Sequence, residues 1–266
     1  MKDKYEFLLS LKILEYEINE LIIYSEECCE CFELLRNRLD YLCKFMVCEE
    51  NVKKWELWGS HNEIKENSER LRETSVRALC HVEKYQSICA CNNKLDVSSY
   101  MTLLSNSVKH EFEKFCIDSK SKVLFIGSGA FPISAMVIAQ EIGAEVMCLD
   151  IDVEAIDLAR KVTKVLGLES IVKFSSKTVD ELCFIKEATH IIIASLVEDK
   201  FKILDNLKDK AASNVKIILR YGNGIKGIFN YPLEKDLSKE WNQTEISKNG
   251  DIYDTIVLEK FHYECS

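Results

Sequence analysis

The sequence predicts an α/β protein in which an N-terminal helical bundle precedes a doubly wound, mostly parallel sheet. Glycine and proline divide the chain: residues 1–120 contain one glycine and no proline, whereas the remainder holds eight glycines and both prolines. The first part repeats apolar residues at helical spacing, and the second alternates short apolar runs with helical segments. We therefore expect a helical domain over residues 1–118 and a sheet domain over residues 119–266.

The expected helices of the first part each carry one apolar stripe. Residues spaced by three and four along a helix share a face, which then packs against neighbouring helices. Two segments have this spacing, namely Leu11, Leu14, Ile18, Leu21 and Ile22 in one and Leu35, Leu39, Leu42 and Met46 in the other.

The second part has the order of elements typical of a parallel sheet. Its expected strands are Val123–Ile126, Glu145–Leu149, Val172–Ser175, His190–Ala194 and Val215–Arg220, and its expected helices are Ile133–Ile142, Val153–Leu166, Val179–Ile185 and Lys200–Leu207. Asn249-Gly250 is a hairpin signal, and the alternating residues of Asp251–Lys260 predict an antiparallel strand after it. This order predicts a Rossmann-like fold of the class I methyltransferase type.

The turn after the first expected strand is typical of a nucleotide site. Gly127 and Gly129, around Ser128, let the backbone turn sharply and bring its N–H groups close to a ligand. Asp150 ends the second strand, where an acid accepts the ribose hydroxyls of an adenosine ligand. Pro132 replaces the third glycine of the dinucleotide fingerprint, which disfavours a pyrophosphate. We expect S-adenosylmethionine; a turn that merely connects is the alternative.

Composition limits the partners. A formal net charge of −9 and a pI near 5.3 argue against nucleic acid, because a phosphate-binding surface needs a basic stripe. The chain has no apolar stretch long enough to span a membrane and no secretory signal, so we expect a cytoplasmic protein that acts on a small molecule. The sequence is compatible with a homodimer.

Twelve cysteines raise the question of a metal site. Cys28-x-x-Cys31 and Cys89-x-Cys91 contain enough thiols for a four-thiolate zinc site. Both pairs lie in helix-like segments without the glycine or proline usual at zinc pairs, and free cysteine is a common small core residue. We expect reduced thiols and no metal.

The fourth expected strand argues against methylation of an amine on a base. It ends in Ala194-Ser195-Leu196-Val197 and lacks the Asn/Asp-Pro-Pro-Tyr type of motif that holds such an amine. The reacting groups are then expected from the helical domain. Glu83 is one candidate, since its helical neighbours Leu79, Gln86 and Ser87 are uncharged and desolvation would raise its pKa toward that of a general base.

Each candidate has an alternative structural role. Glu83 could be a solvated glutamate at a helix edge. Tyr100 follows a polar turn and could present its hydroxyl to a ligand or serve only in packing. Arg220, at a strand tip, could hold a substrate carboxylate or form a structural ion pair.

Taken together, several motifs resemble the nicotianamine synthase family, including its shorter bacterial members that make opine metallophores of the staphylopine type. The resemblance covers about residues 70–260. Its segments are Val123–Ala139, which contains the turn F-x-G-S-G-x-x-P, Asp150-Ile151-Asp152, Ala194–Val197, Arg220–Gly224, Tyr231-Pro232 and Asp254–Val257.

The resemblance implies an activity and a set of site residues. Family members move the aminobutyrate arm of S-adenosylmethionine onto an amine and release 5′-methylthioadenosine. By resemblance the catalytic residues are Glu83 and Tyr100, the cofactor-binding residues are Gly127, Ser128, Gly129, Asp150, Ile151 and Ala194, and the substrate-binding residues are Phe131, Pro132, Arg220 and Tyr231. Ser98-Ser99 departs from the Asp-Asn that usually precedes the tyrosine, so substrate placement there is open.

The expected reaction is one transfer to the α-amine of histidine, in the D form, during metallophore biosynthesis. Three alternatives remain at this point. The enzyme could use glutamate or repeated transfers to make a nicotianamine-like product, it could be an ordinary small-molecule methyltransferase, or the chain could be a non-catalytic binding module.

Overall fold

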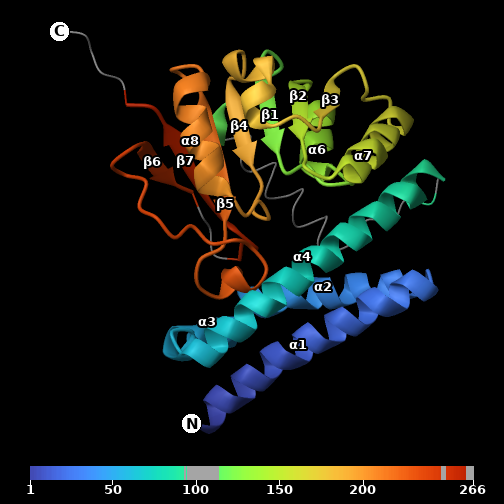
Figure 1. Cartoon of the computed structure of the whole chain (residues 1–266), viewed down its shortest axis with the longest axis vertical. Helices are drawn as coiled ribbons and strands as arrows, with labels where there is room; N and C mark the ends of the chain where they lie inside the picture. The colour runs from blue at the N-terminus through green and yellow to red at the C-terminus, as the bar shows by residue number, and fades with distance from the viewer. Residues whose placement is uncertain (93, 95–113, 247–249, 262–266) are drawn as a thin grey trace.

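The first part of the molecule is a bundle of long helices. The computed structural model describes residues 1–92, 94, 114–246 and 250–261, and Figure 1 shows the arrangement. The helices of the bundle are α1 (Lys2–Glu27), α2 (Cys31–Val47), α3 (Glu49–Trp58) and α4 (Asn62–Cys91). α1 and α2 lie along the side of α4 that faces away from the sheet (Figure 1).

The expected apolar stripes hold the bundle together. Leu11 and Ile18 of α1, Leu35 and Leu42 of α2 and Leu71 of α4 are all fully buried in one apolar cluster. Burial of an aliphatic side chain of this size contributes roughly 1.5–3 kcal/mol. The stripes predicted from spacing are therefore confirmed.

The second part is a seven-stranded sheet with the order β3-β2-β1-β4-β5-β7-β6. Its strands are β1 (Lys122–Ile126), β2 (Glu145–Leu149), β3 (Val172–Ser175), β4 (His190–Ile193), β5 (Lys216–Tyr221), β6 (Asn242–Glu245) and β7 (Asp254–Glu259). The first five are parallel to one another, and β7 is antiparallel to both of its neighbours. The class I methyltransferase-like fold is confirmed. The expected domain boundary falls between the end of α4 and the start of β1.

Both faces of the sheet are covered. Val123 and Phe125 of β1 belong to the apolar cluster that continues into the bundle, whereas Leu124 and Ile126 belong to a separate cluster on the other face. This double burial is why the parallel strands read as unbroken apolar runs. The longer helices are α6 (Ile133–Ile142), α7 (Val153–Val165) and α8 (Lys200–Lys210), and three short 3₁₀ segments are η1 (Val179–Glu181), η2 (Cys183–Lys186) and η3 (Gly224–Ile228).

The helix expected over Val179–Ile185 is wrong. The chain forms the two 3₁₀ segments η1 and η2, separated at Leu182, whose backbone is extended. Glu181 accepts a hydrogen bond from the Thr178 backbone N–H, so the first turn is already capped by its own side chain. The extended backbone at Leu182 leaves only short segments on either side of it, Val179–Glu181 and Cys183–Lys186, which are too short to propagate an α-helix.

No described helix combines the length and the apolar character that crossing a membrane requires.

Candidate active site

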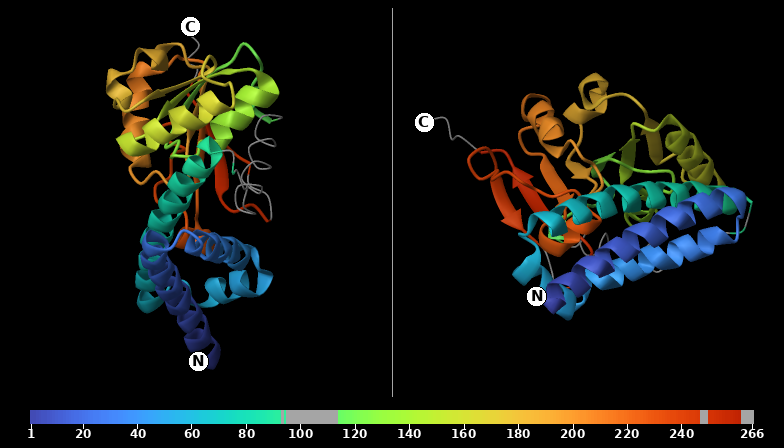
Figure 2. Two further views of the ribbon diagram at one scale, coloured as in Figure 1. Left: turned by 90° about the vertical axis from the view of Figure 1, so that its right-hand side faces the viewer. Right: turned by 60° about the horizontal axis from the view of Figure 1, so that its bottom comes forward.

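Helix α4 crosses the carboxyl-terminal ends of the parallel strands. It contacts η3, which follows β5, and α7, which follows β2. At one end the Arg72 guanidinium donates to Gly227 O at 3.2 Å, and at the other Lys84 Nζ lies 2.8 Å from Asp152 Oδ2. Figure 2 shows α1, α2 and α4 as a layer across the sheet domain. Ligands of open α/β sheets bind at this edge, so α4 forms a wall of the site.

The glycine turn lies at the centre of this edge. Gly127 and Gly129 have φ of +80° and +68°, a backbone region that favours glycine. A Cβ on Gly127 would lie 2.5 Å from Val197 Cγ2 and 3.2 Å from Ala194 Cβ, so the loop after β4 packs directly on the turn. Ser128 is buried beside it. A side chain on either glycine would collide with Val197 or Glu83, so only glycine lets these neighbours pack this closely on the turn.

Asp150 holds the turn in place. Its Oδ2 accepts the Gly129 N–H at 2.8 Å, and its Oδ1 accepts the Asp152 N–H at 3.0 Å. Each carboxylate oxygen has a second lone pair, so the group is still able to accept ribose hydroxyls. The neighbouring Ile151 side chain is 99% exposed, an apolar surface beside the acid. These residues fit the adenosine half of S-adenosylmethionine.

Glu83 reaches the same turn from α4. Its Oε2 accepts the Ala130 N–H at 3.2 Å, and its carboxylate occupies the space that a Cβ on Gly129 would need. Burial, and then the negative charge of Asp150, raise the pKa of Glu83 to about 8, against the opposing effect of the backbone N–H groups. A carboxylate with this pKa exchanges protons near neutral pH, which is what a general base needs.

Ser87, one turn after Glu83, completes the contact. Its Oγ lies 2.7 Å from Ala130 O, while Glu83 receives the N–H of the same residue. The peptide unit on each side of Ala130 is thus bonded to α4, and this fixes the carboxylate relative to the glycine turn. Sequence reasoning used Ser87 only as an uncharged neighbour and missed this role, although its spacing of four from Glu83 was a usable signal.

A second group of contacts joins α4 to the loop after β5. The Tyr231 hydroxyl donates to Glu73 Oε2 at 2.8 Å, and the Arg72 guanidinium lies 4.9 Å from the centre of its ring. Burial and the Glu73 carboxylate raise the pKa of Tyr231. Arg72 and Glu73 were missed from the sequence.

Lys200 links the loops that follow β4 and β5. The side chain is 1% exposed, and its Nζ lies 2.9 Å from Ser195 O, 2.5 Å from Val197 O and 3.4 Å from Tyr231 O. Burial, and then the charge of Arg72, lower its pKa to about 7. Sequence reasoning missed Lys200, but its spacing from the buried Leu204 and Leu207 places it on the apolar stripe of α8.

Three other predicted site residues lie deeper in the structure. Arg220 is 2% exposed, donates to Ser134 Oγ at 3.1 Å and lies between the rings of Phe125 and Tyr253. Phe131 and Pro132 are buried where the turn enters α6. Tyr100 and the neighbouring Ser98-Ser99 lie outside the described residues.

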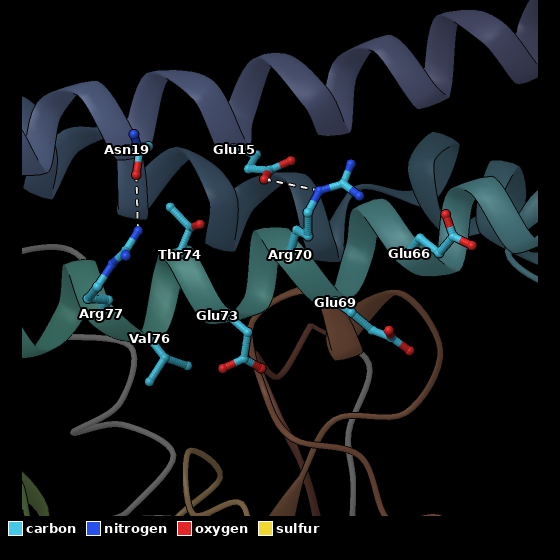
Figure 3. Close-up of a pocket in the computed structure, with 9 residues that line it drawn as sticks. All are labelled: Glu15, Asn19, Glu66, Glu69, Arg70, Glu73, Thr74, Val76 and Arg77. Carbon is cyan, nitrogen blue, oxygen red and sulfur yellow. Dashed lines mark hydrogen bonds and ion pairs between the residues drawn. The ribbon is translucent and has the colours of Figure 1, made fainter.

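Two further features lie apart from the glycine turn. A groove of about 970 Å³ lies between α1 and α4. Figure 3 shows the charged side chains that line it, such as Glu15, Glu69 and Arg70. None of the predicted site residues lines it. Within the described part of the chain, no group of three or more His, Cys, Asp and Glu side chains is arranged to hold a metal ion.

The fold and the site define an S-adenosylmethionine-dependent transferase with a class I methyltransferase-like sheet and a helical wall. Residues 25–266 match the family described as nicotianamine synthase protein, so the chain belongs to the nicotianamine synthase family.

Known proteins agree with this assignment along nearly the whole chain. Proteins named L-histidine 2-aminobutanoyltransferase from Pseudomonas aeruginosa (strain UCBPP-PA14) and Yersinia pestis are 38% and 33% identical, over 98% of this chain and 99% and 98% of theirs. A crystal structure of MtNAS in complex with MTA and tNA has a TM-score of 0.79 and 17% identity, and covers 95% of this chain and 97% of its own. At that identity the likeness concerns the fold.

Proposed function

We propose that the chain transfers the 3-amino-3-carboxypropyl (aminobutyrate) group of S-adenosylmethionine to the α-amine of histidine and releases 5′-methylthioadenosine. The observation that carries the proposal is the Glu83 carboxylate held against the glycine turn, within hydrogen-bond reach of Ala130 N–H. This contact brings a candidate base to the glycine turn, where we propose that the adenosine binds, in a family that uses S-adenosylmethionine. The names of the relatives, L-histidine 2-aminobutanoyltransferase, support the acceptor.

The proposed chemistry is an in-line displacement. The amine lone pair forms a bond to the γ-carbon of the aminobutyrate arm, the carbon–sulfur bond breaks, and its electron pair returns to sulfur as a neutral thioether. The acceptor cannot attack as an ammonium, so Glu83 takes the proton. The methyl carbon is the less hindered electrophile, and selection of the γ-carbon therefore rests on where the protein holds the amine.

The remaining site residues take roles that their positions support. Gly127, Ser128, Gly129, Asp150, Ile151 and Ala194 bind the adenosine half, with Asp150 on the ribose and Ile151 against the base. Tyr231 lines the acceptor side, where Arg72 supplies a positive charge. Tyr100 orients the amine. The buried residues Arg220, Phe131 and Pro132 shape the substrate side of the site. The proposed location is the cytoplasm, where S-adenosylmethionine is made.

Asp150→Ala is expected to weaken S-adenosylmethionine binding by about 1.5–3 kcal/mol, the scale for loss of a charged hydrogen-bonding partner. The variant removes both the ribose acceptor and the carboxylate that fixes Gly129 N–H. Calorimetry measures the affinity. Asp157→Ala, an exposed acid on α7, is the matched control and should bind normally. Equal affinity of the two variants would remove Asp150 from the cofactor site.

Mass spectrometry tests the acceptor. Incubation with S-adenosylmethionine and histidine should give a product heavier than histidine by about 101 mass units, the aminobutyrate group replacing one proton at the proximate nucleophile. The names of the relatives favour the L form over the D form expected from the sequence, so L-histidine, D-histidine and glutamate are each supplied in a separate reaction and the product yields are compared. A product from glutamate would refute the proposed acceptor, and a product carrying two transferred groups would refute a single transfer. Either result leaves the transfer chemistry intact.

A further inference from the structure

Lys200, at the start of α8, is a buried lysine whose ammonium group is bound by backbone carbonyls. The residue is 1% exposed, and its Nζ lies 2.9 Å from Ser195 O, 2.5 Å from Val197 O and 3.4 Å from Tyr231 O. In the part of the chain that the structure describes, no carboxylate pairs with it. An ammonium has three N–H donors, which these three carbonyls match. A buried lysine is normally paired with an acid, so this carbonyl cage is unusual.

The carbonyl cage joins two loops that bound the candidate active site. Ser195 and Val197 belong to the loop after β4, and Val197 packs on the glycine turn, since a Cβ on Gly127 would lie 2.5 Å from its Cγ2. Tyr231 belongs to the loop after β5 and donates its backbone N–H to Ser195 O at 3.1 Å. Loss of the ammonium would therefore remove a donor from buried carbonyls of both loops.

Tyr231 extends this connection to α4. The centre of its ring lies 5.5 Å from Lys200 Nζ, and its hydroxyl donates to Glu73 Oε2 at 2.8 Å. The tyrosine is thus held at its backbone by the carbonyl cage and at its hydroxyl by the helix that carries Glu83. Because the three carbonyls account for the N–H groups of Lys200, the amine has no donor left for a substrate. Lys200 acts through the loops and not on a reacting atom.

We propose that Lys200 is a positioning residue for aminobutyrate transfer, whose ammonium fixes Tyr231 and the loop after β4 so that the acceptor amine, and not water, meets the γ-carbon. The inference rests on the proposed function. In-line attack requires close alignment, and a misplacement of about 1 Å costs about 10²-fold in rate.

A loosened site opens a competing reaction. The oxygen of a water molecule forms a bond to the γ-carbon, the carbon–sulfur bond breaks with its electron pair returning to sulfur, and one proton is released. The products are homoserine and 5′-methylthioadenosine, with no transfer to histidine. Ordered loops around a site exclude water and so suppress such side reactions.

The ratio of products tests the proposal. With S-adenosylmethionine and L-histidine, the wild-type enzyme should release equal amounts of 5′-methylthioadenosine and the aminobutyrate–histidine product, after subtraction of a blank without enzyme. Lys200→Met keeps a side chain of similar length without N–H donors, so it should form that product about 10²-fold more slowly and release excess 5′-methylthioadenosine, matched by homoserine. Lys202→Met, at an exposed lysine of the same helix, is the control and should keep equal amounts.

A purely structural role would not change this ratio, because an unfolded fraction lowers both products together. A Lys200→Met enzyme that is slow but releases equal amounts overturns the proposal. Circular dichroism checks folding, and if the methionine variant does not fold, Lys200→Gln replaces it, with two N–H donors and the same expected excess. Equal amounts from that variant overturn the inference alone. A wild-type enzyme that makes no aminobutyrate–histidine product overturns the proposed function and this inference together.

Discussion

Turnover should fall by roughly 10²–10⁴-fold when Glu83 is replaced by glutamine, the usual span for loss of a general base. Glutamine keeps the shape of the side chain and can accept the Ala130 N–H through its amide oxygen, but it takes no proton from the acceptor. Affinity for S-adenosylmethionine should change little, so the loss appears in kcat. Single-turnover kinetics and calorimetry separate the two quantities.

Glu69→Gln is the matched control, because Glu69 is an exposed glutamate on the same helix, about four turns away. It should retain normal turnover. If Glu83→Gln also retains normal turnover, or loses it only because the thermal melt shows an unfolded protein, the carboxylate belongs to the scaffold and the base lies elsewhere.

The pH dependence has a definite sign. The base works only when ionised, so kcat/KM should rise with pH through about 8, the raised pKa of Glu83. In Glu83→Gln that limb disappears, and activity recovers only at higher pH, where the free acceptor loses its own proton. Folding stability moves the other way: because the native pKa lies above the ordinary value of 4.5, the folded state loses stability as pH rises from about 4.5 to about 8.

Gly129→Ala should lower turnover by about 10²-fold or more through displacement of the same carboxylate. The new methyl group would take the position that the Glu83 carboxylate occupies, and the flexible side chain would turn away from Ala130 N–H. The alanine is also strained at φ +68°, at about 1–2 kcal/mol. Steady-state kinetics and a denaturant melt measure both effects.

Gly143→Ala distinguishes strain from displacement. Gly143 has φ of +76°, and a Cβ there would have no heavy atom within 4 Å, so this substitution carries similar strain without a clash. Both variants should lose comparable stability, but only Gly129→Ala should lose turnover. Equal activity of the two variants would mean that the packing of Glu83 on the turn has no part in catalysis.

Local sequence patterns predicted most of the fold, because the buried apolar residues of most helices and strands recur at the spacing of that element. The apolar runs before Gly127 and Asp150 are strands, as their short length and the turn residues that follow them indicate. The helix predicted over Val179–Ile185 is wrong because the backbone is extended at Leu182, a break that the spacing of the apolar residues does not encode.

The site was predicted less completely. The uncharged neighbours of Glu83 predicted its raised pKa, but its contact with Ala130 joins residues 47 apart, and no local spacing encodes that distance. A lysine is expected at the surface, and Lys200 is buried because backbone carbonyls of two loops, at Ser195 and Tyr231, accept hydrogen bonds from its ammonium group. The Tyr231 bond to Glu73 is likewise a long-range contact. The role of Tyr100 stays a prediction.

Isotope tracing tests the central claim most directly. One sample of S-adenosylmethionine carries ¹³C in the methyl group and a second carries it in the aminobutyrate arm, and each is incubated with the enzyme and histidine. The arm label should appear in the amino-acid product and the methyl label in 5′-methylthioadenosine. Methyl label in the amino-acid product, with S-adenosylhomocysteine as the nucleoside, would contradict aminobutyrate transfer.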